Sequence, residues 1–448
     1  MRGNMDLLRD DVRKTYRRYL AAAFGSSFIS TIYSFVDMIV VGQYQGPSGT
    51  AALALISPVW NIIFSLGMLF GIGGSVHFGM LRGEKDNVPG TENRYFTSAL
   101  YVTGTLSALI MTVLLCFDGA IFRALGAEGE LLTLALDYFR PVRFAVPCYM
   151  LGQVVAAFLR NDNDPGLATA AVLIGGLFNV FGDCYFTFVL DMGLFGAGLA
   201  TAIGSALTLA IMLTHFFKKK NTLRLVPIRQ LSGTVGRMIE TGFSAFFADL
   251  AMGIVTALLN RGIVRYAGTD ALAVYGVIVY VGTCAQCSAY SVGQAAQPLF
   301  SINFGARKWD RIRQTQTCAI RSVIVFSLFW TGVSMAFPEQ IVRIFMDATP
   351  GVLEIAPTII RIYATSFLLL PFNIYSAYYF QSIMRARAAL WLAVARGLVI
   401  SGGLILLLPL IFKATGLWIA MPITDAITFA ATLFLTIRYT KTLEEGLL

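Results

Sequence analysis

The chain has 448 residues, of which 56% are hydrophobic and 13% are charged, and its formal net charge is +9 with a mean hydropathy of +0.70. This apolar fraction is far higher than a soluble globular domain needs, so the composition excludes that class of protein. Apolar stretches recur along almost the whole chain, and each is long enough to cross a bilayer core of about 30 Å as a helix of about 20 residues.

These stretches predict an all-α integral membrane protein with twelve transmembrane helices and no separate soluble domain. The predicted spans are residues 17–42, 51–81, 95–117, 132–158, 168–190, 193–216, 236–264, 270–302, 315–336, 355–383, 388–412 and 414–438. The N-terminus is polar and basic and lacks a signal-peptide cleavage site, so we expect the first span to stay in the protein.

The basic residues are distributed unevenly between the loops. Lys and Arg are concentrated in the two tails and in the even-numbered loops. The odd-numbered loops hold only Arg123, Arg265, Arg343 and Lys413 well outside the spans. This is the positive-inside pattern, so we expect both termini to be cytoplasmic and the protein to lie in the cytoplasmic (inner) membrane. The net charge then reflects orientation in the lipid bilayer, and we expect no nucleic acid partner.

The two halves of the chain resemble each other in sequence. "TAALAL" (50–55) resembles "TDALAV" (269–274), and "GAGLATAIG" (196–204) resembles "ATGLWIAMP" (414–422). Two copies of a six-helix unit have the same orientation, which predicts pseudo-two-fold symmetry about the membrane normal and a cavity between two lobes. The predicted parts are an N-terminal lobe (1–216), a cytoplasmic linker (217–235) and a C-terminal lobe (236–448).

Four acidic residues lie well inside predicted spans, namely Asp37, Asp183, Asp249 and Asp425. An ionised carboxylate in hydrocarbon costs several kcal/mol, so such residues indicate a function. Asp37, in the apolar run "YSFVDMIVVG" (33–42), lies about 8 Å from the outer end of its span, and Asp183 lies about 10 Å from the outer end of its own. The two carboxylates therefore share a level in the outer half of the N-terminal lobe.

Two neutral polar residues are predicted at the same depth. Asn179 lies one helical turn before Asp183 on the same helical face, and Thr201 lies about 12 Å from the outer end of the next span. Oxygen ligands of this kind suit a hard cation such as Na⁺, and one of two neighbouring carboxylates can carry a proton near neutral pH. We therefore predict that Asp37, Asn179, Asp183 and Thr201 bind a coupling ion, Na⁺ or H⁺, without any cofactor. A structural hydrogen-bonding network is the alternative.

The other two in-span acids receive different interpretations. Arg396 lies on the span that precedes Asp425 and runs antiparallel to it, at a depth that a long arginine side chain can bridge, which favours a structural ion pair. Asp249 has no partner that the sequence reveals and lies near mid-membrane. It is predicted either to face the cavity and attract cationic substrates or to carry a second proton.

Several weaker motifs favour structural roles. "CAQC" (284–287) has redox or metal spacing, but it lies in an apolar helix without a nearby histidine, so packing is preferred; the six cysteines indicate no disulfide framework. "NDNDP" (161–165) is interpreted as a polar cytoplasmic turn. His77 and His215 lie near the inner ends of their spans and are interpreted as interfacial packing residues.

At these positions the sequence resembles the multidrug and toxic compound extrusion (MATE) family over essentially the whole chain. The segments that carry the resemblance are "DMIVVGQYQGPSGTAALAL" (37–55), "FLRNDNDP" (158–165), "LFNVFGD" (177–183), "GAGLATAIG" (196–204), "VGQAAQPLFSINFGARKWDR" (292–311) and "TGLWIA" (415–420). The resemblance implies a secondary antiporter that expels organic, often cationic, compounds in exchange for inward Na⁺ or H⁺. Asp37, Asn179, Asp183 and Thr201 match the cation site of one branch.

Another branch of the family uses acids in the seventh and tenth spans. Asp249 matches the first position, but the predicted tenth span contains no acid, so a complete cation site in the C-terminal lobe is not expected. A lipid-linked precursor flippase of the same superfamily stays open as an alternative, and a membrane-embedded enzyme is disfavoured because no span presents a nucleophile with a base or a set of metal ligands.

The sequence therefore predicts a cation-coupled multidrug exporter that works by alternating access, rather than an enzyme. We expect small organic molecules as substrates and a monomer in the lipid bilayer. Aromatic residues of the central spans are candidates for lining the substrate cavity together with Asp249, although packing explains any one of them equally well. These candidates are Trp60, Phe64, Phe158, Tyr275 and Tyr280.

Overall fold

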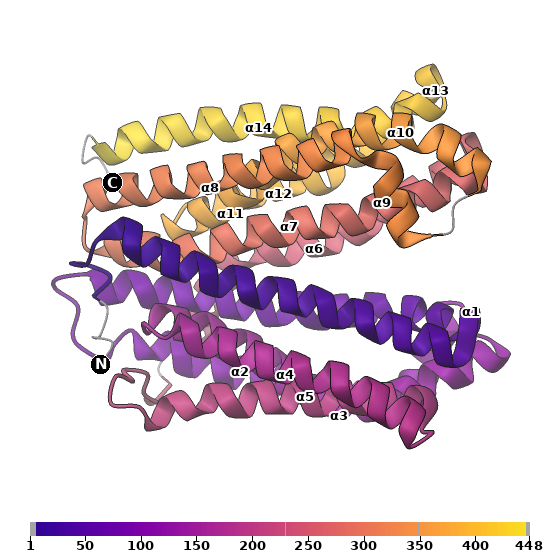
Figure 1. Ribbon diagram of the computed structural model, residues 1–448. Helices are drawn as coiled ribbons and strands as arrows, with labels where there is room; N and C mark the ends of the chain where they lie inside the picture. Colours follow the sequence, from indigo (N-terminus) through magenta and orange to yellow (C-terminus); the bar gives the residue numbers. More distant parts are fainter. Residues whose placement is uncertain (1–5, 229, 347–348, 445–448) are drawn as a thin grey trace. The chain divides into compact units, whose positions relative to one another are not determined.

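The computed structural model describes residues 6–228, 230–346 and 349–444, and most of these residues lie in helices (Figure 1). The ends of the two predicted lobes (residues 1–5 and 445–448) and Arg229 of the predicted linker lie outside the described residues. In the first half the α-helices are α1 (Val12–Gly83), α2 (Asn93–Ala124), α3 (Gly129–Asn161), α4 (Pro165–Cys184), α5 (Gly193–Leu213) and α6 (Leu231–Tyr266). In the second half they are α7 (Gly268–Gly305), α8 (Trp309–Ala336), α9 (Pro338–Phe345), α10 (Pro350–Ala364), α11 (Leu370–Ser382), α12 (Ala386–Val394), α13 (Ser401–Phe412) and α14 (Ala414–Glu444).

Short helical segments of different winding interrupt several spans. They are η1 (Tyr185–Val189) and η4 (Ala395–Ile400), which are π-helical, and η2 (Thr214–Phe217) and η3 (Thr365–Leu368), which are 3₁₀-helical. Within the described residues, twelve helical stretches are long and apolar enough to cross a membrane. The predicted fold class, an all-α membrane protein with twelve spans, is confirmed. Hydrocarbon offers the backbone no water to bond, and a helix satisfies its own N–H and C=O groups.

The first two predicted spans form one continuous element that turns back on itself. Figure 1 shows this reversal within α1. It occurs at Gly46, whose backbone has φ 67° and ψ −150°, and it separates the spans Val12–Gly46 and Ser48–Gly83. Only glycine adopts this conformation without steric cost, because a Cβ atom clashes there with the backbone. The short α9 after the ninth span is an element that the sequence pattern did not predict.

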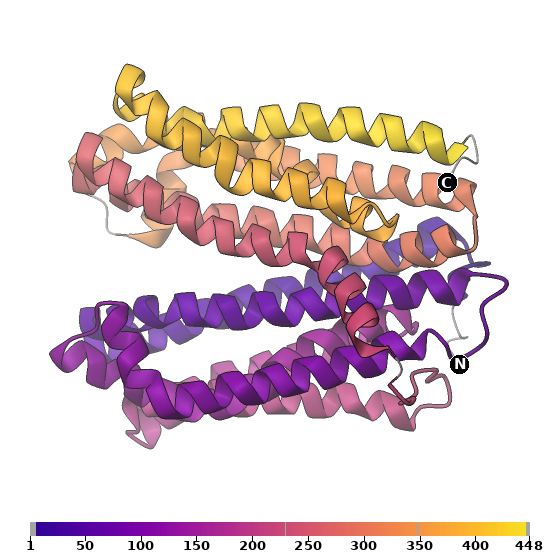
Figure 2. The ribbon, with the colours of Figure 1, turned by 180° about the vertical axis from the view of Figure 1, so that it is seen from behind.

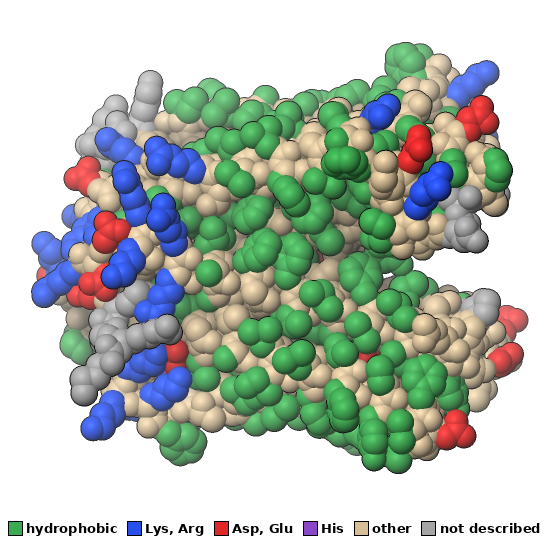
Figure 3. Space-filling view, in the orientation of Figure 1, with side chains coloured by type: hydrophobic (Ala, Val, Ile, Leu, Met, Phe, Trp, Pro, Cys, Tyr) green, Lys and Arg blue, Asp and Glu red, His purple; other side chains and the backbone are tan. Residues whose placement is uncertain are grey.

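The sides of the helices carry an apolar surface. Figure 3 shows hydrophobic side chains along the visible flanks of the helices, with Lys and Arg gathered near helix ends. Among the exposed large hydrophobic residues, Leu109 is 60% exposed, Phe181 67% and Leu410 70%. Such extensive apolar exposure destabilises a protein in water but suits contact with lipid tails. The surface therefore agrees with the predicted spans.

Contacts between residues divide the chain into two compact units. Unit 1 contains residues 21–246 and also the first ten residues, whereas unit 2 contains residues 247–448 and also residues 11–20. Helix α6 begins at Leu231, so part of the predicted linker is helical, and its first half belongs to unit 1. Figure 2 shows the extended segment between α5 and α6 leading into these first turns of α6. The predicted lobe limits of 1–216 and 236–448 stay a prediction.

Within unit 1, α5 packs unusually closely against its two neighbours. A Cβ atom built on Gly198 of α5 lies 2.0 Å from the backbone oxygen of Tyr138 in α3. On the other side, a Cβ atom on Gly204 lies 2.9 Å from the backbone oxygen of Gly175 in α4. Small residues at these positions let helix backbones approach in a way that larger side chains prevent. Thr201 lies between the two close approaches and is therefore held near both α3 and α4.

The close approach at Gly198 generates a stability prediction. Gly198→Ala places a methyl group against the Tyr138 carbonyl, so α3 and α5 must separate, and we expect a loss of about 1–3 kcal/mol of stability, measured as a lower Tm in detergent. Gly152→Ala is the matched control, since Gly152 is a buried glycine of α3 whose added Cβ meets nothing within 4 Å. Equal melting temperatures for the two variants contradict the prediction.

Candidate functional site

The four polar residues predicted to share a depth lie in one hydrogen-bonded network in unit 1. Asn179 of α4 donates through Nδ2 to Asp183 Oδ1 over 3.2 Å and to Thr201 Oγ1 of α5 over 3.1 Å. Tyr138 of α3 donates through Oη to Asp37 Oδ2 of α1 over 2.8 Å. The hydroxyls of Tyr138 and Thr201 are 3.4 Å apart, which joins the two parts.

The hydrogen bonds of this network run in one direction, toward the carboxylates. Because the single hydroxyl proton of Tyr138 is donated to Asp37, Tyr138 can only accept from Thr201, which in turn accepts from Asn179. The two amide protons of Asn179 are used on Asp183 and Thr201. Every proton of the chain is thus directed away from the amide and toward an acid, so one oxygen of each carboxyl group acts as an acceptor.

Three acceptor atoms of the network have no hydrogen-bond donor among the residues that the structure describes. These buried atoms are Asp37 Oδ1, Asn179 Oδ1 and Asp183 Oδ2. The side chain of Asp183 is fully buried, and Asn179 is only 4% exposed. A buried oxygen without a donor loses free energy relative to one that is hydrogen-bonded, by roughly 1–3 kcal/mol. Carboxylate and amide oxygens without donors are the atoms that coordinate a hard cation or accept a proton.

Tyr138 is the member of the network that the sequence did not reveal. An aromatic residue in an apolar helix is most often a packing residue, and nothing in its spacing distinguishes Tyr138 from the other tyrosines. Its position follows from the contact between Gly198 and its own carbonyl, which holds α3 against α5. Its side chain is 3% exposed, and the hydroxyl connects Asp37 to Thr201.

The candidate cavity residues of unit 1 have different surroundings. Trp60 stacks on Tyr149 with ring centroids 4.6 Å apart, and Phe64 lies 6.4 Å from the same ring. Phe158 has no exposed surface and packs edge-on against Phe78 and Phe96. Phe158 therefore packs in the core of unit 1, because the rings of Phe78 and Phe96 both lie against it.

In unit 2, Asp249 of α6 accepts a hydrogen bond from Tyr290 of α7 over 3.1 Å. Tyr275 is 3% exposed and lies in the core of this unit, 6.0 Å from the ring of Tyr363. Tyr280 stacks almost parallel on Phe345 of α9, with centroids 5.3 Å apart. All three candidates thus contact residues that their sequence positions did not indicate as partners.

Arg396 and Asp425 form an ion pair within unit 2. Arg396 donates through Nε to Asp425 Oδ1 over 2.7 Å, and the Asp425 side chain is completely buried. Ser366 of η3 donates to the other carboxylate oxygen, and Asn373 of α11 donates to Oδ1 over 3.1 Å. Both oxygens of Asp425 therefore have donors, in contrast to Asp37 and Asp183. A fully bonded, charge-neutral pair favours a structural role.

Breaking this pair is expected to destabilise unit 2. Asp425→Asn or Arg396→Gln alone leaves one buried charge without its partner, at a cost of about 3–5 kcal/mol, and should lower the yield of folded protein. The double variant Asp425→Asn with Arg396→Gln should recover part of that yield. Folded yield is measured by size-exclusion chromatography in detergent. A normal yield combined with lost transport in Asp425→Asn would assign the residue to the mechanism instead.

His215 differs from its sequence interpretation, whereas "NDNDP" forms a polar turn between α3 and α4 as predicted. His215 was expected to pack at the interface, but it is fully buried and contacts two carboxylates of that turn, with Nε2 2.7 Å from Asp162 and Nδ1 2.9 Å from Asp164. The interpretation of His215 as a packing residue is wrong, because its ring contacts two aspartates that are distant in sequence. These three residues meet where α3 ends, α4 begins and η2 lies. The only feature of the local sequence that pointed to these contacts was the position of His215 close to "KKK" (218–220).

His77, the other histidine, lies in contacts within unit 1. Its Nε2 atom lies 3.1 Å from Thr241 Oγ1 and 3.3 Å from the backbone oxygen of Arg237, and its ring stacks on Tyr95. His77 therefore fastens α1 to the first half of α6, which agrees with a packing role.

Comparison with known proteins gives consistent similarities. The family model MatE matches residues 22–184 and 245–404. The Multidrug export protein MepA of Staphylococcus haemolyticus is 26% identical over 413 residues, which cover 91% of this chain and 90% of that protein. MepA of Staphylococcus aureus is 24% identical over 377 residues, covering 84% and 82% of the two chains.

Solved structures show the same fold. An outward-facing multidrug resistance MATE family transporter of the MOP superfamily has a TM-score of 0.90 and 22% identity, with 99% of both chains covered. A MOP superfamily transporter from Pyrococcus furiosus, described as having a binding pocket of reverse polarity, has a TM-score of 0.89 and 22% identity over 98% of both chains. At this identity the similarity establishes the fold alone. The chemistry of each site has to be argued from the residues of this chain.

Proposed function

The chain belongs to the MatE family, and we propose that it is a multidrug exporter that moves organic, often cationic, compounds out of the cell in exchange for inward Na⁺ or H⁺. Its similarity to proteins named multidrug export proteins supports the substrate class. The twelve apolar helices support a place in the membrane. Transport, rather than catalysis, is the activity that these features favour.

The observation that carries the proposal is the set of donor-free oxygens on Asp37, Asn179 and Asp183. Each buried acceptor without a donor costs free energy, and two of the three acceptors in this network belong to carboxylates. Here the donors are used up and three acceptors remain. A cation or a proton satisfies them directly and offsets the negative charge of two carboxylates held in an apolar unit.

Ion exchange at this network gives each residue a separate part. Asp37 and Asp183 carry the charge that a cation or proton neutralises. Asn179 contributes a neutral oxygen, and Thr201 and Tyr138 provide hydroxyls whose protons can rotate as the charge changes. We propose that binding of the ion favours one conformation of the carrier and that its release favours the other, so that the ion gradient drives substrate export.

The arginines inside the spans support export over the flipping of a lipid-linked precursor. A pyrophosphate group calls for several buried arginines that are free to bind it. In this chain Arg396 is paired with Asp425, whereas Arg261 and Arg321 are exposed. Trp60 and Phe64 of unit 1 stay proposed contacts for aromatic substrates, through ring stacking. Asp249 of unit 2 separately stays a proposed contact for cationic groups, through charge.

Removing the charge of Asp37 tests the ion-coupling proposal. Asp37→Asn keeps the side-chain shape but cannot hold a cation or exchange a proton, so we expect a folded protein with efflux reduced to the background of empty vesicles. Asp183→Asn should behave alike, and Asn179→Ala, Thr201→Ala and Tyr138→Phe should retain partial activity because each removes one neutral group. Efflux of a fluorescent cation is measured in proteoliposomes with Na⁺ and pH gradients imposed separately.

Equilibrium binding of the same fluorescent cation in detergent separates coupling from folding. Binding should survive in all five variants, since the ion network is enclosed within unit 1. Asp86→Asn, which changes an exposed acid, is the matched control and should retain wild-type efflux. Wild-type efflux in Asp37→Asn would remove this residue from the mechanism. A joint loss of stability and binding would identify the network as structural instead.

We also propose that the chain works as a single copy in the cytoplasmic membrane with both termini inside. The prediction concerns Lys219, an exposed residue between α5 and α6. A single cysteine at this position, in a variant without the six native cysteines, should react with a membrane-impermeant maleimide only after the cells are opened. A cysteine at the exposed Glu128 should react in intact cells. The opposite labelling pattern at the two positions would show that the orientation is the reverse of the proposed one.

A further inference from the structure

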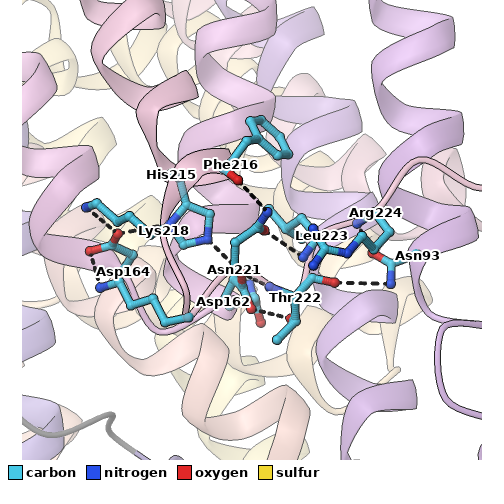
Figure 4. A network of polar contacts seen from close by, with 12 residues as sticks. Asn93, Asp162, Asp164, His215, Phe216, Lys218, Asn221, Thr222, Leu223 and Arg224 are labelled. Carbon is cyan, nitrogen blue, oxygen red and sulfur yellow. Dashed lines mark hydrogen bonds and ion pairs between the residues drawn. The ribbon is translucent and has the colours of Figure 1, made fainter.

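A second buried charged cluster lies in unit 1, apart from the ion network. Its acids, Asp162 and Asp164, belong to the turn between α3 and α4, and its central base is His215 of η2 (Figure 4). The remaining members come from the end of α1 and from the segment that follows η2, here called the connecting segment (residues 218–228). None of the functions proposed above uses these residues.

Asp162 contacts three parts of the chain. Its Oδ2 atom accepts from His215 Nε2 over 2.7 Å and from the Thr222 backbone N–H over 2.9 Å. Its Oδ1 atom accepts from Arg82 of α1 over 2.8 Å and also from the Thr222 hydroxyl. The carboxylate has no exposed surface, so each of these donors compensates for its removal from water.

Asp164 contacts the same histidine from the other side. It accepts from His215 Nδ1 over 2.9 Å, from Lys218 Nζ over 2.8 Å and from Lys220 Nζ over 2.7 Å. Its side chain is 8% exposed, whereas the two lysines reach solvent. Asp164 therefore fixes the first residues of the connecting segment, and Asp162 fixes Thr222 two residues further on.

The protonation of His215 follows from its partners. Burial alone raises the pKa of Asp162, but the hydrogen bonds from His215 and Thr222 and the charge of Arg82 outweigh burial, so this pKa lies below its ordinary value. Burial likewise raises the pKa of Asp164, and the donors His215, Lys218 and Lys220 lower it well below its usual range. Two ionised carboxylates only accept hydrogen bonds, so both ring nitrogens of His215 must donate, and the ring is an imidazolium.

The rest of the connecting segment is bonded to α2. The backbone N–H of Arg224 donates to Asn93 Oδ1 over 2.9 Å, and Asn93 donates back to the Thr222 carbonyl over 3.3 Å. The backbone N–H of Val226 donates to Thr97 Oγ1 over 3.1 Å. Leu223 is 1% exposed and packs in the hydrophobic cluster of unit 1. The segment is therefore held by side chains at alternate residues, as a strand is held in a sheet.

The first half of α6 is fixed to unit 1 by backbone contact. A Cβ atom on Gly73 of α1 lies 2.0 Å from the Met238 carbonyl oxygen, and a Cβ atom on Gly242 of α6 lies 2.0 Å from the Leu69 carbonyl oxygen. These reciprocal close approaches hold the two helices together over one turn of α6. The connecting segment lies directly before this half-helix in the chain and shares its attachment to unit 1.

We propose that Asp162, His215 and Asp164 form a charged latch that fastens the connecting segment to unit 1, so that the segment and the first half of α6 move with unit 1 as one body. The imidazolium is the central element because it bridges two carboxylates that otherwise repel each other. The segment that resembles a flexible linker in sequence is thus a bonded part of the unit.

Hydrogen exchange of the full-length protein in detergent tests the latch. The reporters are the backbone N–H groups of Thr222, Arg224 and Val226, because each donates to a side chain of unit 1. In His215→Gln the neutral amide cannot donate to both acids as a cation does, and we expect these three amides to exchange at least about tenfold faster than in the wild type. Amides in the middle of α3 and α5 should keep their wild-type rates.

Two further variants keep the test decisive. Thr222→Val removes one hydroxyl donor from Asp162 at nearly constant volume, and we expect the same amides to exchange about threefold faster even if His215→Gln fails to fold. Lys219→Gln is the matched control, since this exposed lysine lies between Lys218 and Lys220 without a contact to either acid, and its exchange should equal that of the wild type. Unchanged exchange at the three amides in Thr222→Val and in any folded His215→Gln protein overturns the latch. The measurement uses neither substrate nor ion gradient, so it is independent of the proposed export.

Discussion

The absence of water from the hydrocarbon core is the constraint on which the rest of this structure depends. It forces the backbone into helices, because a helix satisfies its own polar groups. It also forces each in-span acid to find a donor within the protein, and all four do so: Asp37 contacts Tyr138, Asp183 contacts Asn179, Asp249 contacts Tyr290 and Asp425 contacts Arg396. The chemistry of each acid then depends on whether hydrogen-bond donors reach both of its carboxylate oxygens.

Asp425 differs in this respect from Asp37 and Asp183. Asp425 has a charged partner and two neutral donors, so both of its oxygens are satisfied. Asp37 and Asp183 have only neutral donors, and each keeps one buried oxygen without any. A carboxylate with a charged partner and donors on both oxygens stabilises a fold. A pair of carboxylates that each keep one oxygen without a donor supports exchange of a cation. The same residue type thus occurs in two different environments, which the surrounding donors distinguish.

Irregular helical segments accompany these polar sites. The π-helical η1 begins two residues after Asp183, and the π-helical η4 contains Arg396, while the 3₁₀-helical η3 contains Ser366. A change of winding rotates the residues that follow it relative to a regular helix, and such segments often occur at functional sites. The regular parts instead serve close packing, as at Gly198 and Gly204 of α5, which keep Thr201 within reach of both α3 and α4.

The sequence by itself determined the features that depend on local composition and on position along one helix. Hydropathy located the twelve spans, because each spanning helix satisfies its own backbone and is therefore one contiguous apolar stretch of sequence. The rise per residue of a helix placed Asp37, Asn179, Asp183 and Thr201 at one depth. It also identified Arg396 as a partner within reach of Asp425.

Only the tertiary structure decided which helix faces meet. The hydroxyl of Tyr138 bonds to Asp37 and contacts Thr201 because a glycine of α5 lets α3 approach. Phe158 is buried because Phe78 and Phe96 pack against it. His215 bridges Asp162 and Asp164 because three helix ends converge on a segment that, in sequence, resembles a basic linker. These contacts join residues far apart in the chain, and periodicity along a single helix carries no information about the rotation of its neighbours.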